Sequence, residues 1–180
     1  MKPSAIKQVI SQLRKKALSG DEMLNLLDDK ANLITYPELS KMKSIDEALG
    51  KHNACVILYE TKKNYGHWCC IFKNKKKCIE FFDPYGMMPD DQLKFIPMHF
   101  RKLNNEKFSH LTYLLWKSGC NVEFNHTRLQ KKIKDINTCG RWCCMRIGLR
   151  DIPLDKFVKL FTMNKYLAPD DLVTALTYFV

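Results

Sequence analysis

The stretch of sequence that decides the fold is residues 67–82, which read HWCCIFKNKKKCIEFF. Two runs rich in apolar and aromatic residues, His67 to Phe72 and Cys78 to Phe82, flank a polar segment from Lys73 to Lys77. This pattern predicts two strands joined by a hairpin turn, with the lysines of the turn in solvent. Pro84 and Gly86, shortly after this stretch, end the second strand.

Working outward, Ala54 to Tyr59 is a compact apolar run that predicts a buried strand before the hairpin. Leu111 to Trp116 is expected to form a fourth strand. Helices are expected in six places: over Pro3 to Lys16, after Asp21, from Ser44, over Gly140 to Arg150, over Leu154 to Met163 and over Pro169 to Tyr178. Helices before and after a cluster of strands predict an α+β domain, with a central mixed sheet flanked by helices.

The length of 180 residues fits one domain spanning residues 1–180. We expect a helical N-terminal part over 1–50, a core over 54–150 and C-terminal helices over 153–180. No apolar run approaches the roughly 18 residues that a membrane span requires, so no membrane partner is expected. The first twenty residues are basic and lack the apolar core of a signal peptide, which favours an intracellular product.

The net charge of +11 is large for this length. It favours an anionic partner such as nucleic acid, which basic side chains bind by neutralising phosphates. The alternative is a soluble surface that happens to be rich in lysine, and charge alone does not decide between the two.

The eight cysteines are expected to be mostly buried, reduced thiols. They lie in apolar runs, and the sequence contains no Cys-x-x-Cys or His-x3-His pair, so the spacing does not favour a zinc site.

Cys139 is a candidate nucleophile because it lies at the start of the helix predicted from Gly140. Asn137 or Thr138 can cap this helix. The dipole and the free backbone N–H groups of a helix N-terminus favour an anion such as a thiolate. The same N–H groups could stabilise the oxyanion of a tetrahedral intermediate.

His67 and Asp83 are candidates for the base and for the group that orients it, which a nucleophilic thiol requires. If their strands pair as a hairpin, the two residues lie at the same end of the sheet and are neighbours. The alternative makes His67 an ordinary strand residue, Asp83 a turn residue before Pro84, and Cys139 a buried helix-end thiol. Each alternative is plausible by itself, but the coincidence of all three residues favours a catalytic site.

An amide side chain could donate a hydrogen bond to the oxyanion. Gln130 lies nine residues before Cys139 and Asn137 lies two residues before it. The residues alone leave both candidates open.

These motifs resemble the adenovirus-type (adenain-like) maturation cysteine proteases, whose wider clan includes the ubiquitin-like-protein proteases. The resemblance rests on His67-Trp68, Phe82-Asp83-Pro84-Tyr85-Gly86, Gln130 and Cys139-Gly140, in that order. Adenain has Glu where this chain has Asp83, and its Gln-to-Cys interval is shorter. The segments from Ile34 to Leu39 and from Thr138 to Trp142 look closer to proteases of virophages, Polinton-like elements and large DNA viruses.

The resemblance implies the adenain-like protease fold, with the nucleophile at the N-terminus of a central helix. It implies an endopeptidase that trims capsid and core precursors in the virion and at the intracellular site of assembly. Cys139 would attack, His67 would act as base and then acid, Asp83 would orient His67, and Gln130 would join the Cys139 N–H at the oxyanion. No cofactor is needed for this chemistry, a monomer is expected, and DNA or a peptide could act as activator.

Two other functions remain open at this point. Within the same clan, the chain could be a deubiquitinating or SUMO-removing isopeptidase. From a different class, it could be a catalytically inactive, basic DNA-binding protein of the virion.

Overall fold

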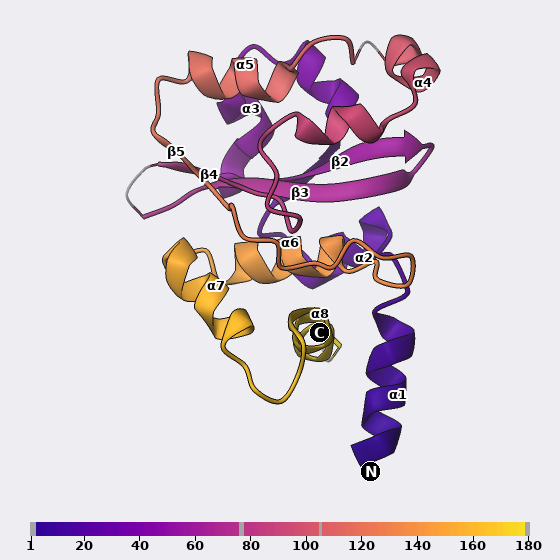
Figure 1. Ribbon diagram of the computed structural model, residues 1–180. Coiled ribbons are helices and arrows are strands. Elements are labelled where there is room, and N and C mark those ends of the chain that lie inside the picture. Colours follow the sequence, from indigo (N-terminus) through magenta and orange to yellow (C-terminus); the bar gives the residue numbers. More distant parts are fainter. Residues whose placement is uncertain (1–2, 76–77, 105, 179–180) are drawn as a thin grey trace.

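A computed structural model describes residues 3–75, 78–104 and 106–178 (Figure 1). Its centre is a five-stranded mixed sheet whose strands are neighbours in chain order. The strands are β1 (Asn32–Thr35), β2 (Ala54–Lys62), β3 (Tyr65–Lys73), β4 (Ile79–Phe82) and β5 (Val122–Phe124). β1 runs parallel to β2, β2 to β4 are antiparallel, and β5 runs parallel to β4. The α+β class with a mixed sheet flanked by helices is therefore confirmed, as are the three strands predicted around residues 54–82.

Six of the helices in the described residues lie close to where the sequence predicts them, and two form where no helix was predicted. The helices are α1 (Pro3–Leu13), α2 (Gly20–Leu27), α3 (Ile45–Leu49), α4 (Met98–Leu103), α5 (His110–Lys117), α6 (Cys139–Gly148), α7 (Leu154–Thr162) and α8 (Pro169–Leu176), with 3-10 turns at Tyr36–Lys41, Gly50–His52 and Asp91–Phe95. Within the described ranges, none of these helices has the length and apolar character needed to cross a membrane.

Both faces of the sheet are covered, because successive side chains of a strand point to opposite faces. In β2, Val56 and Leu58 face one core while Ile57 and Tyr59 face the other. Figure 1 shows α2, α6, α7 and α8 on one side of the sheet and α3, α4 and α5 on the other. A strand buried on both faces is apolar at almost every position, which explains the continuous run from residue 54.

The prediction of a fourth strand over Leu111 to Trp116 is wrong, since this segment is the helix α5. Leu111, Leu114 and Leu115 are buried in the second core at helical spacing, while Trp116 is 77% exposed. The aromatic and apolar composition suggested a strand, but the spacing of three and four residues matches the one face that the helix buries.

Two strands are present that the sequence did not reveal. β1 lies within the N-terminal part that was expected to be helical, and β5 follows α5. Both are short and form the two edges of the sheet, each pairing in parallel with a neighbour far along the chain. Such strands carry too few residues for a periodic signal. The hairpin turn predicted at Lys73 to Lys77 lies partly outside the described residues.

Candidate active site

His67 and Asp83 are neighbours, as the predicted hairpin requires. β3 and β4 pair in antiparallel register with Cys70 opposite Phe82, so the start of β3 and the residue after β4 lie at the same end of the sheet. Nε2 of His67 is 2.8 Å from Oδ1 of Asp83, which is hydrogen-bond distance. The two residues are 9% and 0% exposed, so the pair is shielded from water.

The carboxylate of Asp83 is held by further donors. The backbone N–H of Tyr85 donates to Oδ1 at 2.7 Å, and Nε2 of Gln92 donates to Oδ2 at 2.5 Å. The side-chain amide of Asn125 donates to the backbone oxygen of Asp83 at 2.8 Å. A buried carboxylate needs such partners, and here they fix its orientation toward His67.

The imidazole of His67 is also held by an aromatic ring. The Tyr85 ring stacks on it with the two ring centres 4.4 Å apart and the planes 8° from parallel. Tyr85 therefore contacts both members of the pair, through its ring on one and through its backbone on the other.

Cys139 is the first residue of α6 and reaches the same place from below the sheet. Its side chain lines the same cavity as His67 and lies close enough to raise the pKa of the imidazole. Because Nε2 of His67 faces Asp83, Nδ1 is the ring nitrogen left for the thiol. The expected capping of this helix by a side chain is wrong: Thr138 occupies the N-cap position, but its hydroxyl donates to Asp170. The first N–H groups of α6 thus retain the anion preference of a helix N-terminus.

The surroundings of His67 favour its charged form. Burial is the largest single effect and lowers the pKa of the imidazole, but the charge and hydrogen bonding of Asp83 together with Cys139 outweigh it. The net result is a pKa raised to about 9. At neutral pH this histidine is an imidazolium next to a thiol at a helix N-terminus.

Other cysteines near the site are in surroundings that keep them neutral. Burial raises the pKa of Cys69 and Cys143 well above the usual range, and it raises the pKa of Cys144 to about 12. A thiol that stays protonated is a poor nucleophile. Cys139 differs from these three in its position, since it lies at the N-terminus of α6 and near His67.

A group of possible metal ligands overlaps this site. Ligand atoms of His67, Cys69 and Asp83 lie within 4.8 Å of one another, and all three residues are buried. His67 and Asp83 are already hydrogen-bonded to each other, and burial favours the protonated thiol of Cys69. A metal ion bound here would therefore compete with the His67–Asp83 hydrogen bond.

Gln130 and Asn137 both line the cavity that contains Cys139, but their amides are used differently. Nδ2 of Asn137 donates to the backbone oxygen of Lys15 at 2.7 Å, which ties it to the end of α1. Nε2 of Gln130 donates to the backbone oxygen of Ile136 at 3.1 Å and lies 3.4 Å from the hydroxyl of Tyr85. The latter contact is long, so one N–H of Gln130 is weakly engaged.

The cavity at these residues has a volume of about 230 Å³. Of the five residues that the sequence singled out, the cavity is lined by His67, Gln130, Asn137 and Cys139 but not by Asp83. Its wall also includes aromatic, apolar and basic side chains, namely Tyr65, Tyr85, Phe95, Ile96 and Lys132. Nζ of Lys132 lies 3.5 Å from the centre of the Phe95 ring, so this part of the wall combines a cation with an aromatic face.

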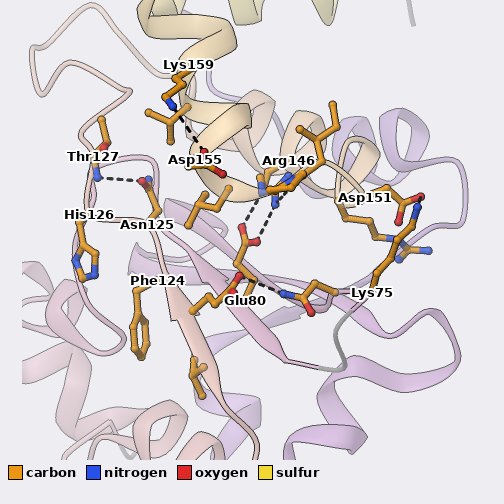
Figure 2. A pocket seen from close by; sticks show the side chains of 18 residues that line it. Lys75, Glu80, Phe124, Asn125, His126, Thr127, Arg146, Asp151, Asp155 and Lys159 are labelled. Carbon is orange, nitrogen blue, oxygen red and sulfur yellow. Dashed lines mark hydrogen bonds and ion pairs between the residues drawn. The ribbon is translucent and has the colours of Figure 1, made fainter.

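A larger hollow of about 760 Å³ lies away from this site, between β4, β5 and α7 (Figure 2). Figure 2 shows Arg146 and Glu80 pointing toward each other, and two hydrogen bonds of 2.7 Å join them. Lys75 pairs with Asp151, and Lys159 pairs with Asp155. Within these three pairs the opposite charges neutralise each other.

Sequence reasoning missed Gln92, whose amide contacts Asp83 from a 3-10 turn (Asp91–Phe95). It also missed the double contact of Tyr85, although Tyr85 belongs to the motif quoted for the resemblance. Nothing in the local sequence distinguishes Gln92 from a surface glutamine. The position of Tyr85 two residues after Asp83 is a signal that could have been used, because Asp side chains accept from that backbone N–H in Asx turns.

The chain matches no protein-family model. It is similar to the protein described as "Uncharacterized protein V9" of Sputnik virophage, with 45% identity over 166 residues. That alignment covers 91% of this chain and 95% of V9. Among solved structures, it is similar to the central domain of the uncharacterized Lpg1148 protein of Legionella pneumophila, with 16% identity and a TM-score of 0.42. This second match covers 90% of this chain and 94% of the other.

Proposed function

This chain belongs to the same protein family as the V9 protein of Sputnik virophage, and we propose that it is a cysteine endopeptidase. A virophage origin fits this relationship, and with it a setting in a virus-infected host cell. The observation that carries the proposal is the buried arrangement of Cys139 at the N-terminus of α6, His67 beside it, and Asp83 at 2.8 Å from His67. The fold would then be the adenain-like protease fold that the sequence motifs suggest.

In the proposed reaction, His67 holds the proton of Cys139, and the thiolate attacks the carbonyl carbon of the scissile peptide bond. The carbonyl oxygen becomes an oxyanion in the tetrahedral intermediate. When the intermediate collapses, the C–N bond breaks and the imidazolium gives its proton to the leaving amine. Water, deprotonated by His67, then attacks the thioester carbonyl. The C–S bond breaks, the acid product leaves, and the Cys139 thiolate and the protonated His67 are restored. Asp83 keeps the imidazole oriented and stabilises its charge throughout.

For the oxyanion we propose Gln130 together with the backbone N–H of Cys139. Asn137 is less suited because its amide donates a hydrogen bond to the backbone oxygen of Lys15. Gln130 would turn the N–H that lies 3.4 Å from the Tyr85 hydroxyl toward the oxyanion. The charge on that oxygen makes it a better acceptor than a phenol.

The substrates we propose are capsid and core precursor proteins, cleaved during virion assembly. The test is to incubate the purified protein with the structural proteins of its own virus and to sequence the new termini. Cleavage is expected with the wild type and with Cys120→Ala, a half-buried cysteine outside the site, and not with Cys139→Ala. Equal cleavage by Cys139→Ala contradicts the proposal. Cleavage of a ubiquitin or SUMO conjugate, with the virion proteins left intact, would assign the isopeptidase function instead.

We propose duplex DNA as an activator, because the loop that carries Gln130 is strongly basic. Its basic side chains Arg128, Lys131, Lys132 and Lys134 are all exposed. DNA bound there would neutralise these charges beside the cavity, and the binding would weaken as salt rises. Cleavage is expected to rise on adding duplex DNA in low salt and to return to the basal rate in high salt. DNA binding without any cleavage would favour the inactive virion protein.

A further inference from the structure

Asp170 on the C-terminal helix is buried next to the candidate site although it belongs to none of the motifs. It is the second residue of α8 and is only 2% exposed. A buried carboxylate is costly unless its oxygens accept hydrogen bonds. Three donors from other parts of the chain meet it here.

Two of these donors belong to the start of α6. The Thr138 hydroxyl donates to Oδ1 of Asp170 at 2.6 Å, and Nε1 of Trp142 donates to the same oxygen at 3.1 Å. Thr138 directly precedes Cys139, and Trp142 lies one turn further along the helix. This oxygen therefore fixes the helix end on which Cys139 lies.

The third donor belongs to the loop that carries Gln130. The backbone N–H of Lys131 donates to Oδ2 of Asp170 at 3.0 Å, and Lys131 directly follows Gln130. One carboxylate thus joins the residue before Cys139 to the residue after Gln130. It sets the distance between the two groups that, in the proposed reaction, meet the substrate carbonyl from two sides.

We propose that Asp170 is a positioning residue that fixes Gln130 relative to Cys139. This inference rests on the proposed function. Only a carboxylate fits the role, because it needs two acceptor oxygens. The indole N–H of Trp142 and the backbone N–H of Lys131 can only donate, and they meet different oxygens of Asp170. An asparagine has one oxygen and one NH2 group, so it cannot accept from both. Whichever way its amide turns, Asp170→Asn would therefore place its NH2 group against either the Trp142 N–H or the Lys131 N–H and lose that hydrogen bond.

The fold has a second link that would hold α8 in place in such a variant. Arg141 of α6 donates to the hydroxyl of Thr177 at 3.0 Å and to its backbone oxygen at 3.3 Å. The neighbouring Asp171 offers a matched control. It pairs at 2.7 Å with Arg14, the residue after α1, and contacts neither α6 nor the Gln130 loop through the hydrogen bonds of the described residues.

The first arm of the test measures peptide cleavage by Asp170→Asn and Asp171→Asn. Because a misplacement of about 1 Å can cost on the order of 100-fold, Asp170→Asn is expected to lower kcat by about tenfold or more. KM is expected to stay within about twofold, since the loss concerns the transition state. Asp171→Asn is expected to cleave like the wild type. A folded Asp170→Asn with the kcat of Asp171→Asn overturns the proposal.

The second arm does not depend on proteolysis or on the folding of the Asp170 variant. It measures the rate at which iodoacetamide alkylates Cys139, followed by peptide mass spectrometry. Thr138→Val removes the hydroxyl that donates to Asp170, and Thr138→Ser keeps it. Thr138→Val is expected to slow alkylation by about tenfold and Thr138→Ser to retain the wild-type rate. Equal rates in the two variants overturn the proposal. If the wild type cleaves nothing, the proposed function fails, and this arm still decides the role of the Asp170 contact.

Discussion

Gln92 provides a direct test of how Asp83 is held. Its amide donates to Oδ2 of Asp83 at 2.5 Å, and both side chains are buried. Gln92→Met keeps the length and approximate volume of the side chain but removes the donor. One oxygen of a fully buried carboxylate then loses its partner.

The size of the effect follows from the type of hydrogen bond. A hydrogen bond to a charged group contributes about 1.5–3 kcal/mol, and a buried acceptor left without a partner carries the full cost of its desolvation. For a chain of 180 residues, this corresponds to a fall in melting temperature of about 3–12 °C. Because Asp83 orients His67, cleavage is expected to fall as well, by about tenfold or more.

The assay is thermal unfolding at pH 7 followed by circular dichroism, with peptide cleavage measured on the same samples. Gln8→Met is the matched control, because it replaces the same residue type by the same residue type at an exposed position of α1. It is expected to change stability by less than about 0.5 kcal/mol. If Gln92→Met unfolds at the same temperature as Gln8→Met, the hydrogen bond does not hold Asp83 and the reasoning fails.

Three further predictions concern the site. Because the pKa of His67 is raised to about 9, kcat/KM is expected to fall as pH rises through about 9. Asp83→Asn is expected to move this fall to lower pH. A wild-type pH profile of kcat/KM with its midpoint near 6.5 would contradict the prediction. The raised pKa also means that charged His67 stabilises the folded state. This contribution to the free energy of unfolding is fully present below about pH 6.5 and is lost as pH rises through about 9. Gln130→Ala is expected to lower kcat by about 100-fold and Asn137→Ala by much less, and the reverse order would assign the oxyanion to Asn137. Gly66→Ala would put a Cβ 1.9 Å from the Tyr59 carbonyl oxygen. It is expected to lower the free energy of unfolding, measured in urea, by at least about 1–3 kcal/mol. Gly148→Ala, with open space around the added Cβ, should cause no measurable loss.

The sequence predicted the part of the fold whose signals are local. The apolar runs of β2, β3 and β4 and the helical spacing after Cys139 are visible within ten residues. The hairpin register also placed His67 beside Asp83, because it depends only on two adjacent strands. The catalytic roles of these residues remain predictions.

The rest could not be predicted because it depends on contacts between distant segments. α5 was expected as a strand, since its composition is compatible with either element until the core that it faces is known. The roles of Gln92 and Asp170 have no local signature either. Gln92 reaches Asp83 through a 3-10 turn, and Asp170 reaches Thr138 from 32 residues further along the chain.

The measurement that tests the central claim most directly is the order in which the eight cysteines react with iodoacetamide at pH 7. The claim is that His67 and the start of α6 make Cys139 reactive although it is only 6% exposed. Cys139 is expected to be alkylated before the half-buried Cys78 and Cys120, and His67→Ala is expected to abolish this lead. If Cys78 and Cys120 react first in the wild type, and Cys139 reacts at the same rate with or without His67, Cys139 is not an activated nucleophile and the account is wrong.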